Sequence, residues 1–302
     1  MYKENNFISA VVYLHNNAGK AKPFFATLSE KLNEHFENYE LIAVNDSCTD
    51  STIEELTTWA ESHAYPLTII HMSIHQSREA SMNAGLDATI GDFVYEFDSV
   101  NIDFPWEYIY RAYETAIKGN DIVSVCPNRL PGVNKLFYSL FNHYSHSPCK
   151  IRTNAFRIIS RRALHRVHAI SNYMPYRKAA YAASGLKCDD LEYSGKCTVH
   201  QENRIQLAIE SMLLYTRFGY RITSVLSITM ILITLCSFIY TASIYCLGNP
   251  VTGWTTITLL LSTSFTGLFI GNAIAVKYLA LILEQQSKRE RYLIHHTEKI
   301  QK

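Results

Sequence analysis

Apolar and polar positions alternate in regular blocks along the first 125 residues. Short runs rich in β-branched and aromatic residues end in polar loops, and each run is followed by a stretch with apolar residues at helical spacing. The runs predict strands over 7–14, 39–44, 67–72, 93–97 and 121–125, and the stretches between them predict helices over 21–36, 51–63, 78–90 and 107–118. Strands that alternate with helices favour an α/β fold, with a mostly parallel sheet flanked by helices.

Two of the predicted strands end in an acidic residue. Asp46 follows the second strand and Asp98 follows the fourth. Open parallel sheets bind ligands at the carboxyl ends of their strands, although acids at such positions also serve as helix caps or turn formers. The sequence has neither G-x-G-x-x-G nor G-x-x-x-x-G-K-[ST], so it predicts neither a dinucleotide Rossmann site nor a P-loop.

The last third of the chain is apolar over an unusual length. No Asp, Glu, Lys or Arg occurs between Ile222 and Val276, and a Gly-Asn-Pro turn signal divides the region into apolar runs over 223–247 and 255–276. Each run exceeds the roughly 20 helical residues that cross a hydrocarbon core. The pattern predicts two transmembrane helices, because every backbone polar group in lipid must be bonded internally. A buried helical hairpin of a soluble domain is the alternative, but soluble helices rarely lack a charged face over such a length.

Basic residues set the orientation of these helices. Arg217 and Arg221 precede the first run, Lys277 and Lys288 follow the second, and the loop between the runs has none. The positive-inside rule therefore predicts a multi-pass inner-membrane protein with both termini in the cytoplasm. Apolar residues at helical spacing over 205–213 predict a helix that lies on the membrane surface or packs on a core. The predicted segments are a cytoplasmic domain (1–200), this amphipathic helix (201–221), the transmembrane pair (222–283) and a cytoplasmic tail (284–302).

Charge and cysteine content narrow the class of protein. The chain has 28 Lys and Arg against 27 Asp and Glu, a net charge of +1. That balance gives no basic face for nucleic acid, so no nucleic-acid partner is expected. The 7 cysteines are dispersed and include no C-x-x-C, which predicts reduced thiols in a reducing compartment and no disulfide framework.

Four segments resemble one family in its own order. The segment 39–52 (YELIAVNDSCTDST) resembles the "YEIIxVDDGSTDxT" motif of family 2 glycosyltransferases, and 78–92 resembles the helix that follows in that family. Glu96 to Ser99 stand at the family's DxD motif. The segment 153–162 (TNAFRIISRR) resembles a motif of the polyprenyl-phosphate branch, which is dolichol-phosphate mannose synthase-like and commonly carries two C-terminal transmembrane helices.

The resemblance implies a GT-A type fold and an inverting sugar transferase for cell-surface glycans. Its substrates would be a nucleotide-diphosphate sugar and a membrane polyprenyl phosphate, and homo-oligomers through the membrane helices are compatible with this branch. The implied roles are nucleotide-sugar binding by Asp46, Arg78 and Asp98, catalysis by Asp98 and Asn154, Mg²⁺ or Mn²⁺ binding by Asp98, and acceptor-phosphate binding by Arg157, Arg161, Arg162 and Arg177.

The sequence also departs from the family at chemically important positions. Val100 replaces the second acid of DxD, Ile102 occupies the next ligand position, and Ala155 replaces an acid beside Asn154, so metal dependence stays open. A phosphate acceptor needs no general base, because its second pKa is about 6 and it is already a dianion at neutral pH. Losing the acid therefore favours a lipid phosphate as acceptor.

Two other interpretations remain. In one, the acceptor is a saccharide hydroxyl and Asp189, Asp190 or Glu192 serves as the base. In the other, the chain is a non-catalytic, membrane-anchored relative, an interpretation that rests on the acids missing at 100 and 155.

Overall fold

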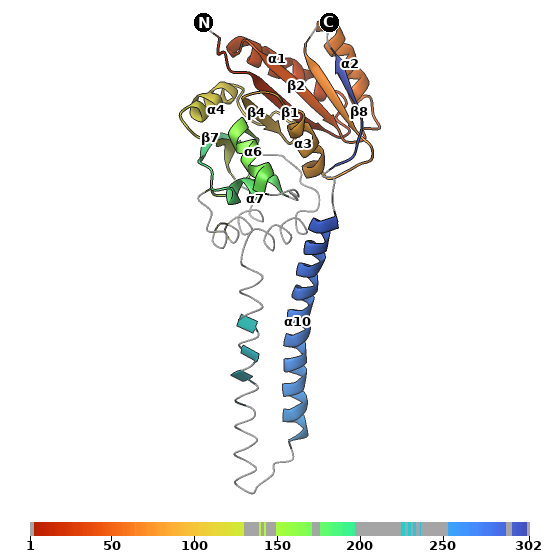
Figure 1. Ribbon diagram of the computed structural model, residues 1–302, viewed down its shortest axis with the longest axis vertical. Helices are drawn as coiled ribbons and strands as arrows, with labels where there is room; N and C mark the ends of the chain where they lie inside the picture. The colour runs from red at the N-terminus through yellow and green to blue at the C-terminus, as the bar shows by residue number, and fades with distance from the viewer. Residues whose placement is uncertain are drawn as a thin grey trace. The chain divides into compact units, whose positions relative to one another are not determined.

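The structure is a computed structural model that describes residues 3–63, 65–129, 149–170, 176–196, 253–287 and 292–300, with isolated positions between them (Figure 1). The chain divides into two compact units. The first comprises Met1–Ala208 with Lys288–Lys302, and the second comprises Ile209–Ser287.

An eight-stranded mixed sheet forms the centre of the first unit, in the order β7-β5-β6-β4-β1-β2-β3-β8. Strands β4, β1, β2 and β3 are parallel neighbours, whereas β6 runs antiparallel to both β4 and β5. The five predicted strands are confirmed, and three more join them. The strands are β1 (Ile8–Leu14), β2 (Tyr39–Asn45), β3 (Leu67–Met72), β4 (Phe93–Phe97), β5 (Ile122–Arg129), β6 (Phe156–Ser160), β7 (Cys188–Lys196) and β8 (Ile294–Ile300).

Helices cover both faces of the parallel strands. Alternate residues of β1 from Ile8 to Leu14 pack in one core with α1, α2 and α4, while Val11 between them faces α3. This alternation is the strand periodicity of two, with both faces buried. The predicted helices are confirmed, and the described helices of this unit are α1 (Ala21–His35), α2 (Thr52–His63), α3 (Arg78–Asp87), α4 (Tyr108–Ile117), α6 (Arg161–Ile170) and α7 (Arg177–Ala183).

Gly85 lets α3 approach the sheet closely. A Cβ atom at this position would lie 2.4 Å from Val11 Cγ1 and 2.6 Å from Val44 Cγ2, which no real Cβ contact allows. Glycine removes that clash. The close packing fixes α3, and with it Arg78 at the amino end of the helix, against the strands whose carboxyl ends form the site described below.

The C-terminal residues complete the sheet. Sequence analysis assigns 284–302 to a tail, but β8 pairs antiparallel with β3, from Leu67 opposite Ile300 to Met72 opposite Ile294. Figure 1 shows β8, in blue, beside strands from the red end of the chain. The strand is exposed except at Ile300, and every residue between Ile294 and Ile300 is polar, so it lacks the apolar alternation by which a strand is predicted.

The second unit contains α10 (Trp254–Ser287), a helix of 34 residues that covers the second apolar run. It exposes large apolar side chains, among them Phe265, Leu268 and Phe269. The first apolar run, apart from isolated positions, and the amphipathic segment 205–213 lie outside the described residues. Among the residues that the structure describes, no helix combines the length and the apolar character that a membrane crossing requires.

Cys149 and Cys188 form a disulfide, with their Cα atoms 5.7 Å apart. The prediction of unpaired thiols is therefore wrong for these two residues. They are 39 positions apart in the sequence, and their spacing gives no sign that β7 returns beside the segment preceding β6. The bond ties the start of β7 to that segment.

Candidate active site

The loops that follow β1, β2 and β3 bring His15, Asp46 and His75 together. Asp46 is completely buried, and its carboxylate is the centre of the group. Oδ2 accepts a hydrogen bond from Tyr13 Oη at 2.9 Å and lies 3.1 Å from His75 Nδ1, while Oδ1 accepts from the backbone N–H of Gln76 at 2.8 Å. Each strand end thus contributes one polar side chain to one edge of the sheet, as predicted for Asp46.

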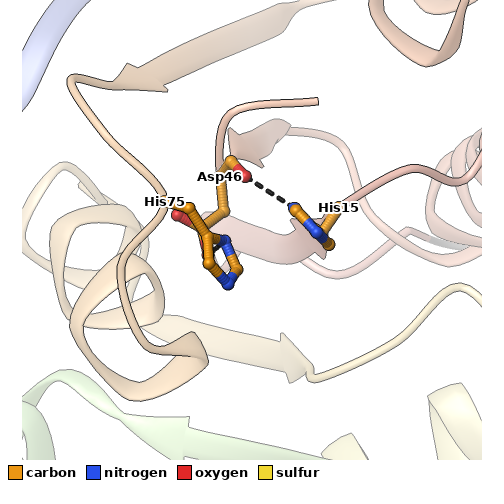
Figure 2. Close-up of side chains that lie close together, drawn as sticks. All are labelled: His15, Asp46 and His75. Carbon is orange, nitrogen blue, oxygen red and sulfur yellow. Dashed lines mark hydrogen bonds and ion pairs between the residues drawn. The ribbon is translucent and has the colours of Figure 1, made fainter. Parts of the chain in front are cut away.

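His15 is fixed by the backbone of the neighbouring strand. Its Nδ1 lies 2.7 Å from the carbonyl oxygen of Asp46, and its ring centroid is 4.3 Å from that of His75 (Figure 2). Because a carbonyl can only accept, Nδ1 must carry the proton of this hydrogen bond. In the neutral ring, Nε2 then keeps its lone pair and can act as an acceptor or a metal ligand.

The two loops that hold His15 and Asp46 are built with unusual backbone geometry. Asn16 and Ser47, which directly follow them, have φ angles of 51° and 55°, in the left-handed region that non-glycine residues rarely adopt. Asn16 Oδ1 accepts from the backbone N–H of Thr49 at 2.8 Å. These contacts hold both loops in one arrangement before any ligand binds, a feature that often marks functional sites.

Arg78 lies at the same edge. It is the first residue of α3, and its guanidinium carbon is 5.2 Å from the centroid of the Tyr13 ring, a cation–π distance. Tyr13 therefore links Arg78 to Asp46. The structure thus brings together two of the three residues, Asp46, Arg78 and Asp98, that the resemblance assigns to nucleotide-sugar binding.

A second buried carboxylate, Asp98, directly follows β4 and is bound by Arg177. Arg177 begins α7 and is 1% exposed; its Nη2 lies 2.5 Å from Asp98 Oδ1 and its Nη1 lies 3.1 Å from Glu96 Oε2. Its Nε and its backbone N–H both donate to Glu79 Oε2 at 2.9 Å. The guanidinium group of Arg177 therefore binds three carboxylates, one from α3, one from β4 and one from the loop after β4.

Arg157 adds a second guanidinium group to this cluster. It lies on β6 opposite Glu96, with Nη1 3.3 Å from Glu96 Oε2 and Nη2 3.7 Å from Asp98 Oδ2. Nη2 also donates to Asn154 Oδ1 at 3.4 Å, and the Tyr181 hydroxyl donates to Glu96. Three carboxylates face two guanidinium groups, which leaves one formal negative charge on the network.

The arginines decide the ionisation of Asp98. Burial alone would raise the pKa of its carboxyl, but the guanidinium groups of Arg177 and Arg157 outweigh burial and hold that pKa well below its usual range. Burial opposes charge on Arg177 as well, yet Glu79, Asp98 and Glu96 raise its pKa well above normal. Asp98 and Arg177 therefore both stay charged at neutral pH.

The residues around Asp98 do not fit the divalent cation that the resemblance places there. Both carboxylate oxygens face guanidinium groups, and the nearby carboxylates Glu79 and Glu96 are bound by Arg177. Val100, at the second position of the motif, is apolar and 2% exposed. Mg²⁺ and Mn²⁺ need several oxygen ligands. Here the arginines balance the charge of the carboxylates that a cation would otherwise bind.

A surface pocket lies beside this network and shares Asn154, Arg157 and Tyr181 with it. Its remaining wall combines apolar residues with charged ones, which are Lys150, Arg152, Lys178 and Asp190. Arg152 lies 2.5 Å from Glu192 and 3.7 Å from Asp190, and burial raises the pKa of the Asp190 carboxyl. With more basic than acidic groups in its wall, the pocket is suited to an anionic group.

Lys150 and Arg152 lie outside the sequence motifs described above. They stand on either side of Ile151, immediately before the 153–162 segment, and this adjacency is the signal that could have identified them. Lys178 follows Arg177 directly, and both approach the network from the amino end of α7.

The four arginines predicted to bind the acceptor phosphate are divided between two edges of the sheet. Arg157 and Arg177 lie in the network, but Arg161 donates to the carbonyl of Gly91 at 2.6 Å and Arg162 contacts Asp121 at 2.7 Å. Gly91 and Asp121 precede β4 and β5, at the amino ends of these strands. Because β6 is antiparallel to both, its first and last residues reach opposite edges, and the structure does not bring Arg161 or Arg162 to the pocket.

The sequence pattern of glycosyl transferase family 2 matches residues 9–184. The chain is 26% identical to a bactoprenol glucosyl transferase of Shigella phage SfX, over 95% of this chain and 98% of that one. It is 22% identical to an uncharacterised glycosyltransferase of Synechocystis sp., over 95% and 94%. Its fold is similar to that of a mannosyltransferase from Pyrobaculum calidifontis in complex with GDP-Man and Mn²⁺, with a TM-score of 0.53, 12% identity and coverage of 95% and 89%.

Proposed function

The chain belongs to glycosyl transferase family 2, and we propose that it moves a sugar from a nucleotide-diphosphate sugar to a membrane polyprenyl phosphate, for cell-surface glycan synthesis or modification. The relative from phage SfX, whose name specifies bactoprenol as a substrate, supports a polyprenyl acceptor. In this chain, the proposal rests on the basic pocket that adjoins the Asp98 network.

The nucleotide binds at the edge formed by the ends of β1 and β2. Asp46 and Arg78 both lie at that edge, and both contact Tyr13. The carboxylate of Asp46 suits the hydroxyl and N–H groups of a ribose and a base, and the guanidinium group of Arg78 suits a phosphate. The fold supports this placement, because open α/β sheets bind ligands beyond the carboxyl ends of their strands. The diphosphate then extends toward β4 and the Asp98 network.

The acceptor phosphate binds in the pocket lined by Lys150, Arg152 and Lys178. Its dianion needs no general base, so the neutral Asn154 and Ala155 beside the pocket are no obstacle to transfer. A phosphate oxygen attacks the anomeric carbon, the bond from that carbon to the nucleoside diphosphate breaks, and the configuration inverts in a single displacement. The protein contributes orientation and positive charge around the leaving diphosphate.

The proposed transfer needs no cation at Asp98. Mn²⁺ accompanies GDP-Man in the Pyrobaculum mannosyltransferase, and the sequence resemblance implies Mg²⁺ or Mn²⁺ here. In this chain the carboxylate at that position is paired with Arg177 and Arg157 instead. These arginines position Asp98 and Glu96, and Lys150, Arg152 and Lys178 in the adjoining pocket supply positive charge to the site.

The proposal places the enzyme at the inner membrane, with the catalytic domain and both termini in the cytoplasm. The charge-free stretch from Ile222 to Val276 and the basic residues that flank it support this placement. The second apolar run is helical in α10. A lipid acceptor and homo-oligomers through the apolar segments are compatible with this arrangement.

A hydroxyl acceptor is a second candidate, favoured by one observation. Asp190 lines the same pocket, and burial raises the pKa of its carboxyl toward the range of a general base. With Asp190 as base, a saccharide or lipid hydroxyl could replace the phosphate. The two candidates differ in whether the acceptor must carry a phosphate.

The test is a transfer assay with the full chain in detergent. Labelled UDP-glucose and GDP-mannose are incubated with either polyprenyl phosphate or the corresponding polyprenol, and label is measured in the lipid fraction. We expect transfer to the phosphate alone, and a Lys178→Gln variant should lower it about tenfold or more, as one charge-assisted contact to phosphate predicts. Arg162→Gln is the matched control, because Arg162 binds Asp121 at the opposite edge.

Transfer to the polyprenol that an Asp190→Asn variant abolishes would contradict the proposal in favour of the hydroxyl acceptor. Absence of transfer from either donor, in protein that still unfolds cooperatively, would point to the non-catalytic interpretation.

A further inference from the structure

His15 and His75, which the proposed transfer does not use, lie beside Asp46 and form a set of possible metal ligands with it. One nitrogen of each histidine and one carboxylate oxygen all lie within 4.8 Å of one another. We propose that these three residues bind a divalent transition-metal ion of the zinc class, separate from the Asp98 position. The proposal does not depend on the proposed sugar transfer.

The ligand types select the class of ion. Two imidazole nitrogens and one carboxylate oxygen suit Zn²⁺ and its neighbours in the first transition row, whereas Mg²⁺ and Ca²⁺ prefer oxygen alone. His75 is half exposed, so an ion can enter from solvent, while the buried Asp46 anchors the site. Three protein ligands leave at least one position for water or a donor atom of a bound molecule.

The hydrogen bonds around the set are those that a metal site requires. His15 donates through Nδ1 to the carbonyl of Asp46, which leaves Nε2 as the ligand atom. Tyr13 and Gln76 donate to the two oxygens of the Asp46 carboxylate and fix its orientation. His75 Nδ1 and Asp46 Oδ2 are already 3.1 Å apart, close enough for both residues to bind one ion.

The site would join three loops that meet at one edge of the sheet. His15 follows β1, Asp46 follows β2 and His75 lies between β3 and α3. Asn16 and Ser47, next to two of the ligands, hold left-handed backbone conformations. A bound ion would therefore lock in place the loops that surround the nucleotide edge.

A second histidine group provides a matched control. His71, His296 and Glu298 lie where β3 pairs with β8. There the His71 and His296 rings stack at 4.0 Å and 10°, and Asn45 bonds to His71 Nδ1. Burial and the adjacent His296 lower the pKa of His71. This group shares no residue with the proposed site, so a substitution within it should leave metal binding at the proposed site unchanged.

The experiment titrates the full chain in detergent with Zn²⁺ against a chromophoric chelator, and with Co²⁺ followed by visible absorption. The variants are His15→Gln, His75→Gln and the control His296→Gln. We expect the first two each to weaken binding by at least about tenfold, as loss of a ligand predicts, and the control to bind as the wild type does. His75→Cys should restore binding and add a thiolate-to-cobalt charge-transfer band, which only direct coordination produces.

Equal affinity in wild type, His15→Gln and His75→Gln would overturn the proposal, and so would loss of binding in His296→Gln alone. The His75→Cys band keeps the test decisive if a glutamine variant folds poorly. The readout involves no sugar donor or acceptor, so its result is independent of whether transfer is observed.

Discussion

Asp46 and Asp98 occupy equivalent places in the fold and have opposite surroundings. Each directly follows a buried parallel strand, and β1 separates the two strands in the sheet. Asp46 receives hydrogen bonds from a tyrosine hydroxyl and a backbone amide and lies beside two histidines. Asp98 is bound by the guanidinium groups of two buried arginines.

The comparison shows that a strand-end acid does not by itself define a cation site. A metal ion can take the place of a proton between a histidine and a carboxylate. It cannot readily displace Arg177, which is held by three carboxylates and whose release would leave buried charges without partners. The partners of each acid therefore decide its chemistry, and the following variants test that difference.

The largest effect is expected from removing the arginine of the Asp98 network. Arg177→Met leaves Glu79, Glu96 and Asp98 buried with one guanidinium group fewer, and should lower the free energy of unfolding by about 3–5 kcal/mol. Denaturant unfolding of the full chain measures this loss. Arg162→Gln, whose guanidinium is largely exposed, should cost at most about 1 kcal/mol, and equal losses in the two variants would contradict the account.

Breaking the disulfide should have the next largest effect. Cys149→Ser removes a cross-link that closes a loop of 39 residues beside the acceptor pocket, and should lower the free energy of unfolding by about 2–4 kcal/mol. The control is Cys48→Ser at the Asp46 edge, where serine can still accept the hydrogen bond from Asn16. A reductant should destabilise the wild type and leave Cys149→Ser unchanged, and identical sensitivity of both would argue against the disulfide.

Asp98→Asn tests the ionisation of the network through pH. The folded-state pKa of Asp98 lies below its unfolded value, so its contribution is present above the unfolded pKa and is lost as pH falls through the folded one. The wild type should be more stable than Asp98→Asn by about 1.5–3 kcal/mol at neutral pH. That difference should stay constant down to about pH 5 and shrink below about pH 4. Shrinkage already between about pH 7 and pH 5 would mean that Asp98 is not held by the arginines.

Tyr13→Phe should have the smallest effect. It removes the hydroxyl that donates to Asp46 but keeps the ring beneath Arg78. Loss of one hydrogen bond should cost about 0.5–1.5 kcal/mol in denaturant unfolding. If Tyr13→Phe lowered the free energy of unfolding as much as Asp98→Asn does, the two carboxylates would not differ in the way described here.

Much of the fold was predictable because local patterns carry it. The parallel strands from Ile8 to Phe97 are buried apolar runs bounded by turn residues, and their helices show apolar residues at helical spacing. The strand Ile294–Ile300 was not predictable, because it is polar, exposed and paired with β3 more than 200 positions earlier. The pairing of Cys149 with Cys188 was not predictable either, because the two residues are 39 positions apart and only the fold brings them together.

The candidate site was predictable only in part. The strand-end rule found Asp46 and Asp98, and the same rule applied to every loop would have found His15 and His75. The role of Arg177 was not predictable, because its partners at 79, 96 and 98 come from other elements. Arg161 and Arg162 shared a motif with Arg157, yet strand direction sends them to the other edge of the sheet.

The most direct test of this account is calorimetric binding of UDP-glucose and GDP-mannose to the full chain, with Mn²⁺ or with a chelator, in the wild type and in Asp98→Asn. The account predicts that any effect of Mn²⁺ on nucleotide binding is the same in both proteins, because Asp98 is committed to Arg177 and Arg157. Binding that requires Mn²⁺ in the wild type and loses this requirement, or is abolished, in Asp98→Asn would show that Asp98 binds the metal and would contradict it.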